Sequence, residues 1–188
     1  MIVQFNIPNA LTIFRIVAIP LIILVFFLPV SWARPASGCL FVLAGVTDWL
    51  DGYLARRLGQ TSKFGAFLDP VADKLIISTA LVLLVRSDPQ IIFSMIAVII
   101  IGREIAVSAL REWMAELGER GQVAVTFFGK WKTTVQMIGI SLMLYQKEIL
   151  GLPIYEIGIA FMLVAAGLTL WSMIDYLRTA WPMMIGRD

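Results

Sequence analysis

The sequence contains no histidine and a single cysteine, Cys39, in its 188 residues. Without histidine, the chain lacks the commonest metal ligand and the commonest general base of enzymes. One cysteine cannot form a disulfide within the chain, and it says little about the cellular compartment. Any metal or acid–base chemistry must therefore rest on carboxylate groups.

Charge is also scarce, because charged residues make up 15% of the chain, whereas about 25% is usual in soluble domains. Hydrophobic residues make up 60%, and the mean hydropathy is +0.88. The formal net charge of +2 gives no reason to expect nucleic-acid binding. The composition therefore predicts an integral membrane protein.

Six apolar windows approach the length of about 20 residues that a membrane-spanning helix needs. They cover residues 7–29, 36–58, 69–86, 90–113, 123–146 and 151–178. The third and fourth include charged residues, which we expect to lie inside the protein, because charge that faces lipid is costly. For either of these two, a buried amphipathic helix is the alternative. No linker, low-complexity tract or repeat divides the chain, so we expect one all-α domain, residues 1–188, built as an integral membrane bundle of six transmembrane helices.

The basic residues predict the orientation of this bundle. Most lysines and arginines lie in or near the connections after the second and fourth windows and after the sixth. The opposite connections contain only Arg34, Arg86 and Lys147. The positive-inside rule then places both termini and the basic connections in the cytoplasm. The first window follows no basic segment and contains Arg15, so we expect a retained span and no cleaved signal peptide.

Polar residues at membrane depth are rare, and ionisable ones mark functional sites. In this sequence they are Thr12, Arg15, Asp48, Asp51, Asp69, Asp73, Arg103, Glu104, Lys130 and Lys132. All of them fall toward the predicted cytoplasmic ends of their helices. This distribution indicates one polar cavity that opens to the cytoplasm and lies in the inner half of the bilayer.

Four aspartates form two closely spaced pairs. Asp48 and Asp51 are three residues apart, so they share one face of a helix. Asp69 and Asp73, four residues apart, share one face of the next helix. Because Pro70 suits the first position of a helix, Asp69 is expected to be its N-cap. A short connection makes the two helices antiparallel neighbours, so the four carboxylates can converge.

Clustered carboxylates repel one another unless positive charge lies between them. Oxygen ligands without histidine or cysteine are what Mg²⁺, Mn²⁺ and Ca²⁺ prefer. A pair of such ions suits phosphoryl transfer, because the metals neutralise charge on the attacking and leaving oxygens. The alternative is a structural network of salt bridges to nearby basic residues such as Arg56, Lys63 and Lys74.

The residues around the aspartates follow the pattern Asp-x2-Asp-Gly-x2-Ala-Arg-x8-Gly-x3-Asp-x3-Asp. Its specified positions are Asp48, Asp51, Gly52, Ala55, Arg56, Gly65, Asp69 and Asp73. The pattern resembles the signature of the CDP-alcohol phosphatidyltransferases, and eight specified residues at fixed spacing make it highly specific. The first window, with Asn9, Thr12 and Arg15, is similar to the first-helix motif of that family.

The resemblance implies an enzyme that transfers a phosphatidyl group from CDP-diacylglycerol to an alcohol. In such an enzyme the four aspartates bind two divalent metal ions, Mg²⁺ or alternatively Mn²⁺, which hold the diphosphate of the donor. The donor pocket is then lined by Asn9, Thr12, Gly52, Ala55, Arg56 and Gly65. Asp73 is also the base that takes the proton of the acceptor hydroxyl, which attacks the β-phosphorus and displaces CMP. The resemblance further implies the inner membrane of a bacterium, and a homodimer is an open possibility.

The acceptor is predicted from a second group of charges, which consists of Arg103, Arg111, Lys130 and Lys132. Basic side chains at this depth favour an anionic acceptor such as sn-glycerol 3-phosphate or inositol phosphate. Serine, choline or free inositol would require less positive charge. The alternative is that these residues pair with carboxylates or only follow the positive-inside rule. The segments around them resemble family members that use glycerol 3-phosphate, so this acceptor is expected.

The competing class of protein is a divalent-cation or proton-coupled transporter, because intramembrane aspartates also mark ion pathways. In a transporter, we would expect acidic residues near the membrane midplane and broken helices in two related halves. Here the aspartates lie toward one side, and one half of the chain has no counterpart in the other. The sequence therefore favours an enzyme.

Overall fold

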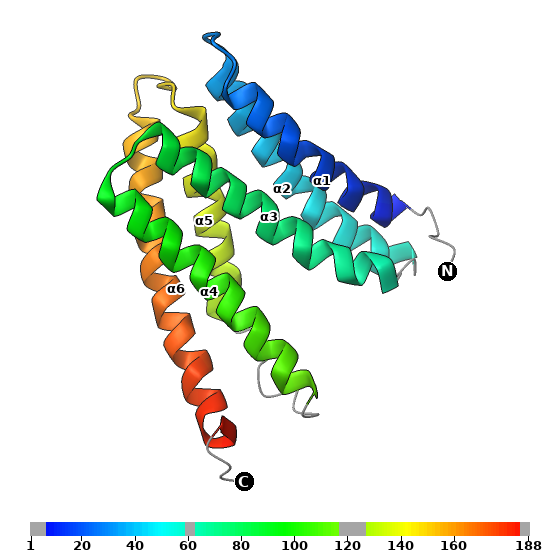
Figure 1. Cartoon of the computed structure of the whole chain (residues 1–188). Coiled ribbons are helices and arrows are strands. Elements are labelled where there is room, and N and C mark those ends of the chain that lie inside the picture. Colours follow the sequence, from blue (N-terminus) through cyan, green and yellow to red (C-terminus); the bar gives the residue numbers. More distant parts are fainter. Residues whose placement is uncertain (1–6, 59–62, 117–126, 185–188) are drawn as a thin grey trace.

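The computed structural model describes residues 7–58, 63–116 and 127–184, and this part of the chain folds into six α-helices (Figure 1). They are α1 (Ile7–Phe26), α2 (Ala33–Leu58), α3 (Lys63–Ser87), α4 (Ile91–Glu116), α5 (Phe127–Tyr145) and α6 (Ile154–Met184). In the described residues, extended backbone pairs only at the isolated bridge between Ile149 and Leu152. The prediction of an all-α fold with six helices is confirmed.

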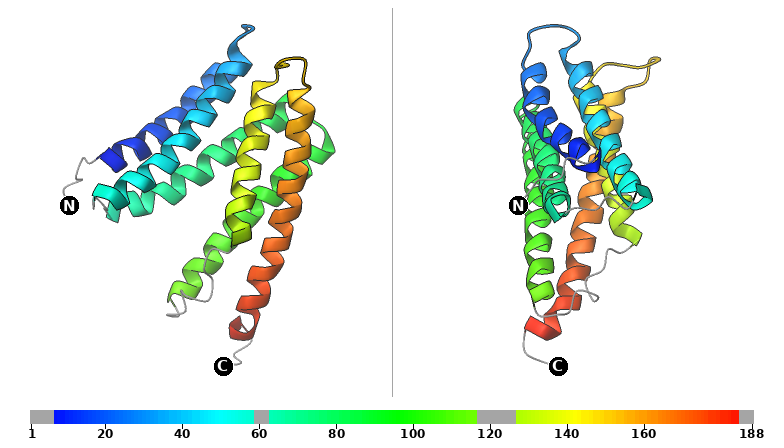
Figure 2. Two further views of the ribbon diagram at one scale, coloured as in Figure 1. Left: turned by 180° about the vertical axis from the view of Figure 1, so that it is seen from behind. Right: turned by 90° about the vertical axis from the view of Figure 1, so that its right-hand side faces the viewer.

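Successive helices run in opposite directions, and they form two groups of three (Figures 1 and 2). In the first group α1 packs along both α2 and α3, and in the second α6 packs along both α4 and α5. The two groups join through contacts of α2 and α3 with α5 and of α3 with α4. They diverge toward the end where α1 begins and α6 ends (Figure 2).

The hydrophobic core lies where the two groups meet, and fully buried residues such as Phe41, Ile100 and Ile140 fill it. Glycine lets the helices approach closely at the edges of this core. A Cβ atom on Gly38 would lie 3.0 Å from the backbone nitrogen of Tyr145. The backbone of α2 therefore approaches the backbone at the end of α5 closely. Small residues at such contacts are typical of helix packing in membranes.

Three helices are long and apolar enough to cross a membrane, namely α1, α4 and α6, with spans at Asn9–Phe26, Ile91–Glu116 and Ile154–Thr179. Large apolar side chains cover much of the outer surface, as Leu24, Val98 and Trp171 illustrate. Such a surface suits contact with lipid better than contact with water. The other helices carry aspartates or lysines within their apolar stretches, which lowers their hydropathy.

The predicted N-cap role of Asp69 is wrong. Helix α3 begins at Lys63, so Asp69 and Pro70 lie inside it. Proline removes one backbone donor from a helix interior, and here this occurs just after the second turn of a helix that continues for more than four turns. The side chain of Asp69 accepts a hydrogen bond from Thr12 of α1 instead of capping α3, and it still lies one turn before Asp73.

Candidate active site

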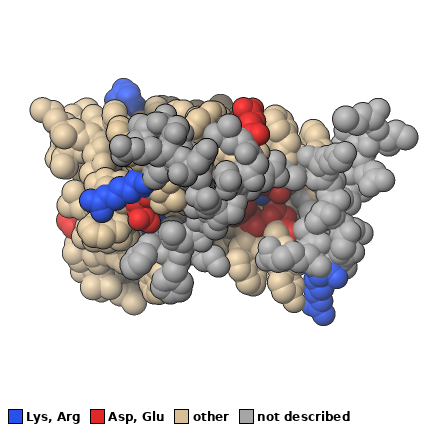
Figure 3. Space-filling model, turned by 90° about the horizontal axis from the view of Figure 1, so that it is seen from below, with Lys and Arg blue, Asp and Glu red and all other residues tan. Residues whose placement is uncertain are grey.

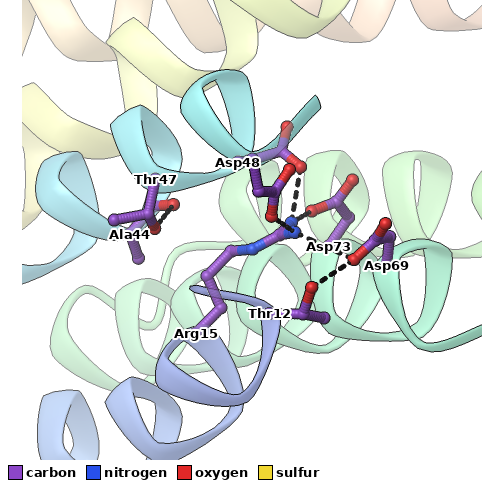
Figure 4. Close-up of polar contacts among 8 residues, drawn as sticks. Thr12, Arg15, Ala44, Thr47, Asp48, Asp69 and Asp73 are labelled. Carbon is purple, nitrogen blue, oxygen red and sulfur yellow. Dashed lines mark hydrogen bonds and ion pairs between the residues drawn. The ribbon is translucent and has the colours of Figure 1, made fainter. Parts of the chain in front are cut away.

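The side chain of Arg15 lies at the point where all four aspartates converge (Figure 4). Its Nη1 donates hydrogen bonds to Asp48, at 2.5 Å, and to Asp73. Its Nη2 donates to Asp51 and, at 3.3 Å, to Asp69. The carboxylates thus come from two helices and the guanidinium from a third, and we call these four acidic residues the aspartate cluster.

Helical spacing explains why these side chains meet. Each aspartate pair lies on one face of its helix, and α1 presents Asn9, Thr12 and Arg15 at intervals of three residues on one face. All three are buried. Thr12 donates from its hydroxyl to Asp69 at 2.5 Å, which fixes α1 against α3. The three helices therefore close around the cluster from three sides.

The aspartate cluster is open on one side. The side chains of Asp48 and Asp73 are each 44% exposed, whereas that of Asp51 is 5% exposed and that of Arg15 is 1% exposed. A view from the end toward which the two helix groups diverge shows acidic side chains gathered in a recess (Figure 3). One guanidinium cannot neutralise four ionised carboxylates, so the cluster retains surplus negative charge.

The donor atoms of the cluster are all carboxylate oxygens, which is the set that hard divalent ions such as Mg²⁺ and Mn²⁺ prefer. In the described residues, no group of three or more acidic or cysteine side chains is arranged to hold a metal ion, and the four aspartates contact Arg15 instead. The oxygen donors match the predicted ions in chemical type, and metal binding would require Arg15 to give up some of its contacts.

The predicted donor pocket lies at the same end of α1, α2 and α3. Asn9 and Thr12 are buried on α1, Gly65 is buried in the first turn of α3, and Gly52 follows Asp51. Ala55 and Arg56 belong to the last turns of α2, but their side chains lie outside the described residues.

A second cluster joins α4, α5 and α6 around Glu104. Oε1 of this carboxylate accepts a hydrogen bond from Nη1 of Arg103 at 3.2 Å and another from Nζ of Lys132. Nη2 of Arg103 also donates to Oγ of Ser172 at 2.8 Å. Both basic residues are buried. Two cations therefore share one carboxylate, which leaves positive charge in surplus.

Arg111 extends this cluster by two turns along α4. Its Nη2 donates to the hydroxyl of Tyr176 on α6 at 2.6 Å. The guanidinium carbons of Arg103 and Arg111 lie 5.3 and 5.1 Å from the centre of the same tyrosine ring. Cation–π attraction therefore helps to hold both arginines. We call Arg103, Glu104, Arg111, Lys132, Ser172 and Tyr176 the Glu104 cluster.

Of the four predicted acceptor residues, three thus belong to one cluster, and the side chain of Lys130 lies outside the described residues. The alternative that Arg103 pairs with a carboxylate is confirmed, through Glu104. Nε of Arg103 and of Arg111 is nevertheless buried without a hydrogen-bond partner in the described structure. Donor capacity therefore remains in this cluster.

A cavity of about 220 Å³ connects the two clusters. Arg15, Asp48 and Asp73 line it on one side, and Glu104, Thr133 and Gln136 line it on the other. Lys74, the neighbour of Asp73, lines it as well. Two of the predicted metal ligands, Asp48 and Asp73, therefore share this cavity with Glu104, whose carboxylate is the partner of Arg103 and Lys132.

Arg15 and Glu104 were predicted only as polar residues of the cavity, without a role of their own, and Tyr176 and Gln136 were not predicted at all, although all four belong to the two clusters or the cavity. The signal for Arg15 was its spacing of three residues from Thr12, which places both on one face of α1. The signal for Glu104 was an acidic residue at membrane depth beside Arg103. Tyr176 and Gln136 had no signal in the sequence, because only the packing of α5 and α6 brings them to this site.

Comparison with known proteins identifies the family. The sequence profile described as CDP-alcohol phosphatidyltransferase matches residues 5–171. The chain is 51% identical over 177 residues to the CDP-diacylglycerol--glycerol-3-phosphate 3-phosphatidyltransferase of Shigella flexneri serotype 5b (strain 8401), and equally to that of Escherichia coli (strain K12). The alignments cover 94% of this chain and 96% of each relative. With the four signature aspartates gathered around Arg15, these matches show that the chain belongs to the CDP-alcohol phosphatidyltransferase family.

Proposed function

We propose that this protein transfers the phosphatidyl group of CDP-diacylglycerol to sn-glycerol 3-phosphate, which gives phosphatidylglycerophosphate and CMP. The relatives that are 51% identical carry the name of this activity. The structural observation that carries the proposal is the cavity between the two clusters. A lipid donor with a diphosphate and an acceptor with a phosphate require two anion sites around one reacting centre, and the two clusters supply candidates for both.

The aspartate cluster would hold two divalent ions, Mg²⁺ or Mn²⁺, and these ions would supply charge neutralisation at the diphosphate. Arg15 keeps the four carboxylates together and would yield contacts when they coordinate metal. Asn9, Thr12, Gly52 and Gly65, with Ala55 and Arg56, would line the donor pocket. The small residues in this set leave room for a diphosphate to approach the helix backbone.

Asp73 is the proposed base, because it lines the cavity and its side chain is 44% exposed. Its carboxylate would take the proton of the primary hydroxyl of glycerol 3-phosphate as that oxygen attacks the β-phosphorus. The bond between the β-phosphorus and the oxygen that bridges to CMP breaks, and CMP leaves with the bonding electrons. No histidine exists in the chain to serve instead.

The Glu104 cluster is the proposed site of the acceptor phosphate. Arg103, Arg111 and Lys132, with Lys130, would donate hydrogen bonds to its oxygens. Glu104 would position Arg103 and Lys132 and prevent the two cations from repelling each other. The surplus of positive charge supports a phosphorylated acceptor over serine, choline or free inositol.

For the membrane arrangement, we propose that all six helices span the bilayer within one domain, residues 1–188. Their antiparallel succession supports this arrangement, as do the lengths of 19 to 31 residues and the apolar outer surface. The bias of basic residues supports a cytoplasmic location for both termini and for the cavity. The inner membrane of a bacterium and a homodimer complete the proposal.

An assay of purified protein in lipid nanodiscs tests the activity. CDP-diacylglycerol is supplied with glycerol 3-phosphate, with or without Mg²⁺, and both CMP and the lipid product are measured. We expect phosphatidylglycerophosphate only when Mg²⁺ is present. Product formed from inositol phosphate or serine but not from glycerol 3-phosphate would refute the acceptor, and activity that persists in a chelator would refute the metals.

A further inference from the structure

Gln136 is a buried polar residue that neither cluster uses. It lies on α5 with 1% of its surface exposed, and it lines the cavity between the clusters. Its amide oxygen Oε1 has no hydrogen-bond partner among the residues that the structure describes. A buried acceptor without a partner is costly to the folded state, and such exceptions in native proteins require an explanation.

The position of Gln136 on α5 relates it to the acceptor site. It follows Lys132 by four residues, so both side chains leave the same face of the helix. Lys132 reaches Glu104, which lines the same cavity. Asp73, the proposed base, lines the cavity from α3. Gln136 therefore shares the wall of one cavity with Glu104 of the proposed phosphate site and with Asp73, the proposed base.

The proposed acceptor has a group that fits this position. Glycerol 3-phosphate carries a phosphate at one end, the attacking hydroxyl at the other, and a secondary hydroxyl between them. The phosphate and the attacking hydroxyl have assigned partners, but the secondary hydroxyl has none. An amide oxygen accepts a hydrogen bond from a hydroxyl without adding negative charge beside a phosphate, which a carboxylate would do.

We infer that Gln136 determines acceptor specificity by accepting, at Oε1, a hydrogen bond from the secondary hydroxyl of the acceptor. This inference rests on the proposed function, since it names the part of glycerol 3-phosphate that the middle of the cavity recognises. A site built to bind a hydroxyl disfavours the analogue that lacks it, because the buried polar group of the protein is then left unpaired.

The test compares glycerol 3-phosphate with 3-hydroxypropyl phosphate, which differs from it only in lacking the secondary hydroxyl. The kcat/KM of each acceptor is measured for the wild type, for Gln136→Met and for Gln136→Glu. Methionine keeps the length of the side chain and removes the amide, whereas glutamate keeps an acceptor oxygen but adds charge. Gln90→Leu is the control, because Gln90 is exposed before α4 and its side-chain amide donates to Asp88, which does not line the cavity.

We expect the wild type to prefer glycerol 3-phosphate by at least about 10-fold. Gln136→Met is expected to bring this ratio close to one, with most of the loss in kcat/KM for glycerol 3-phosphate. Gln136→Glu is expected to weaken both acceptors and to keep the preference, and Gln90→Leu to change neither. If Gln136→Met fails to fold, as judged by size-exclusion chromatography, Gln136→Leu replaces it.

Two results would overturn the inference while the proposed function stands. One is a wild type that uses both acceptors equally well, and the other is a Gln136→Met variant in which both acceptors weaken by the same factor. A wild type that converts neither acceptor would instead overturn the proposed function. The two failures are therefore distinguished by the wild-type activity alone.

Discussion

Asp48 and Asp73 of the aspartate cluster and Glu104 of the Glu104 cluster line the same cavity, but the two clusters are electrostatic opposites. In the first, four carboxylates surround one guanidinium, and Asp48 and Asp73 are nearly half exposed. In the second, one carboxylate serves two buried cations, Arg103 and Lys132. The first therefore has accessible negative charge to spare, and the second has buried positive charge to spare.

This difference indicates how one cavity could bind two anionic substrates, each at its own cluster. Surplus carboxylates attract metal ions, and a diphosphate binds well only after the metals have reversed the sign of that site. Surplus guanidinium and ammonium groups bind a phosphate directly. We therefore expect binding of the donor to depend on metal and binding of the acceptor not to depend on it.

The largest effect is expected from Asp51→Asn, because Asp51 is the most buried member of the aspartate cluster. We expect activity to fall by about 10²–10³-fold or more, since an aspartate that holds metal also stabilises charge in the transition state. The rate of CMP release measures the effect. Asp175→Asn, at an exposed position of α6, is the control and should be neutral. Equal activity of the two variants would contradict the metal site.

Arg15→Met should reveal the surplus of negative charge. Removing one partner of a buried ion pair leaves uncompensated charge, so we expect a loss of about 3 kcal/mol, or roughly 6–12 °C in Tm, when metal is chelated. Mg²⁺ should restore most of the lost stability, because it can replace the guanidinium. Thermal unfolding with and without Mg²⁺ provides the measurement. A variant whose Tm gains no more from Mg²⁺ than the wild type does would show that Arg15 and metal do not share one site.

Lys132→Met removes one of the two buried cations of the Glu104 cluster. We expect the KM for glycerol 3-phosphate to rise by about 10-fold or more, because a charge-assisted hydrogen bond is lost. The KM for CDP-diacylglycerol should stay within about 2-fold, since the aspartate cluster is unchanged. Lys147→Met, in the exposed connection before α6, is the matched control. A rise in both KM values would remove the distinction between the two clusters.

The smallest effect is expected from Tyr176→Phe, which removes the hydroxyl bound to Arg111 and keeps the ring beside both arginines. We expect the KM of the acceptor to rise by about 5-fold, the value of one hydrogen bond of about 1 kcal/mol. Tyr53→Phe is the control, because its hydroxyl also accepts from an arginine, Arg57, but on the exposed surface of α2. No difference between the two variants would leave Arg111 without a role at the site.

The helices were predictable because long apolar runs and their interruptions are local properties of the sequence. The meeting of the aspartates was predictable for the same reason, since spacings of three and four residues fix a helix face. The start of α3 was not, because Pro70 is tolerated inside the helix once neighbouring helices hold it. The local preference of Asp69 for the N-cap position was outweighed by its contacts with Thr12 and Arg15.

The remaining features of the site depend on packing between distant segments. Arg15 precedes Asp51 by 36 residues, and Arg103 precedes Ser172 by 69. Helical periodicity shows which residues share a face but not which helix that face meets. The cavity that Gln136 lines likewise depends on residues from α1 to α5, and Oε1 of Gln136 has no hydrogen-bond partner in the described part of the chain.

Equilibrium binding of each substrate to the protein, with and without metal, tests the division of roles most directly. Isothermal titration calorimetry is performed with CDP-diacylglycerol and, separately, with glycerol 3-phosphate, in Mg²⁺ and in a chelator. We expect CDP-diacylglycerol to bind only in Mg²⁺ and glycerol 3-phosphate to bind in both conditions. Loss of glycerol 3-phosphate binding in the chelator, or CDP-diacylglycerol binding that survives it, would show that the two clusters do not divide the substrates in this way.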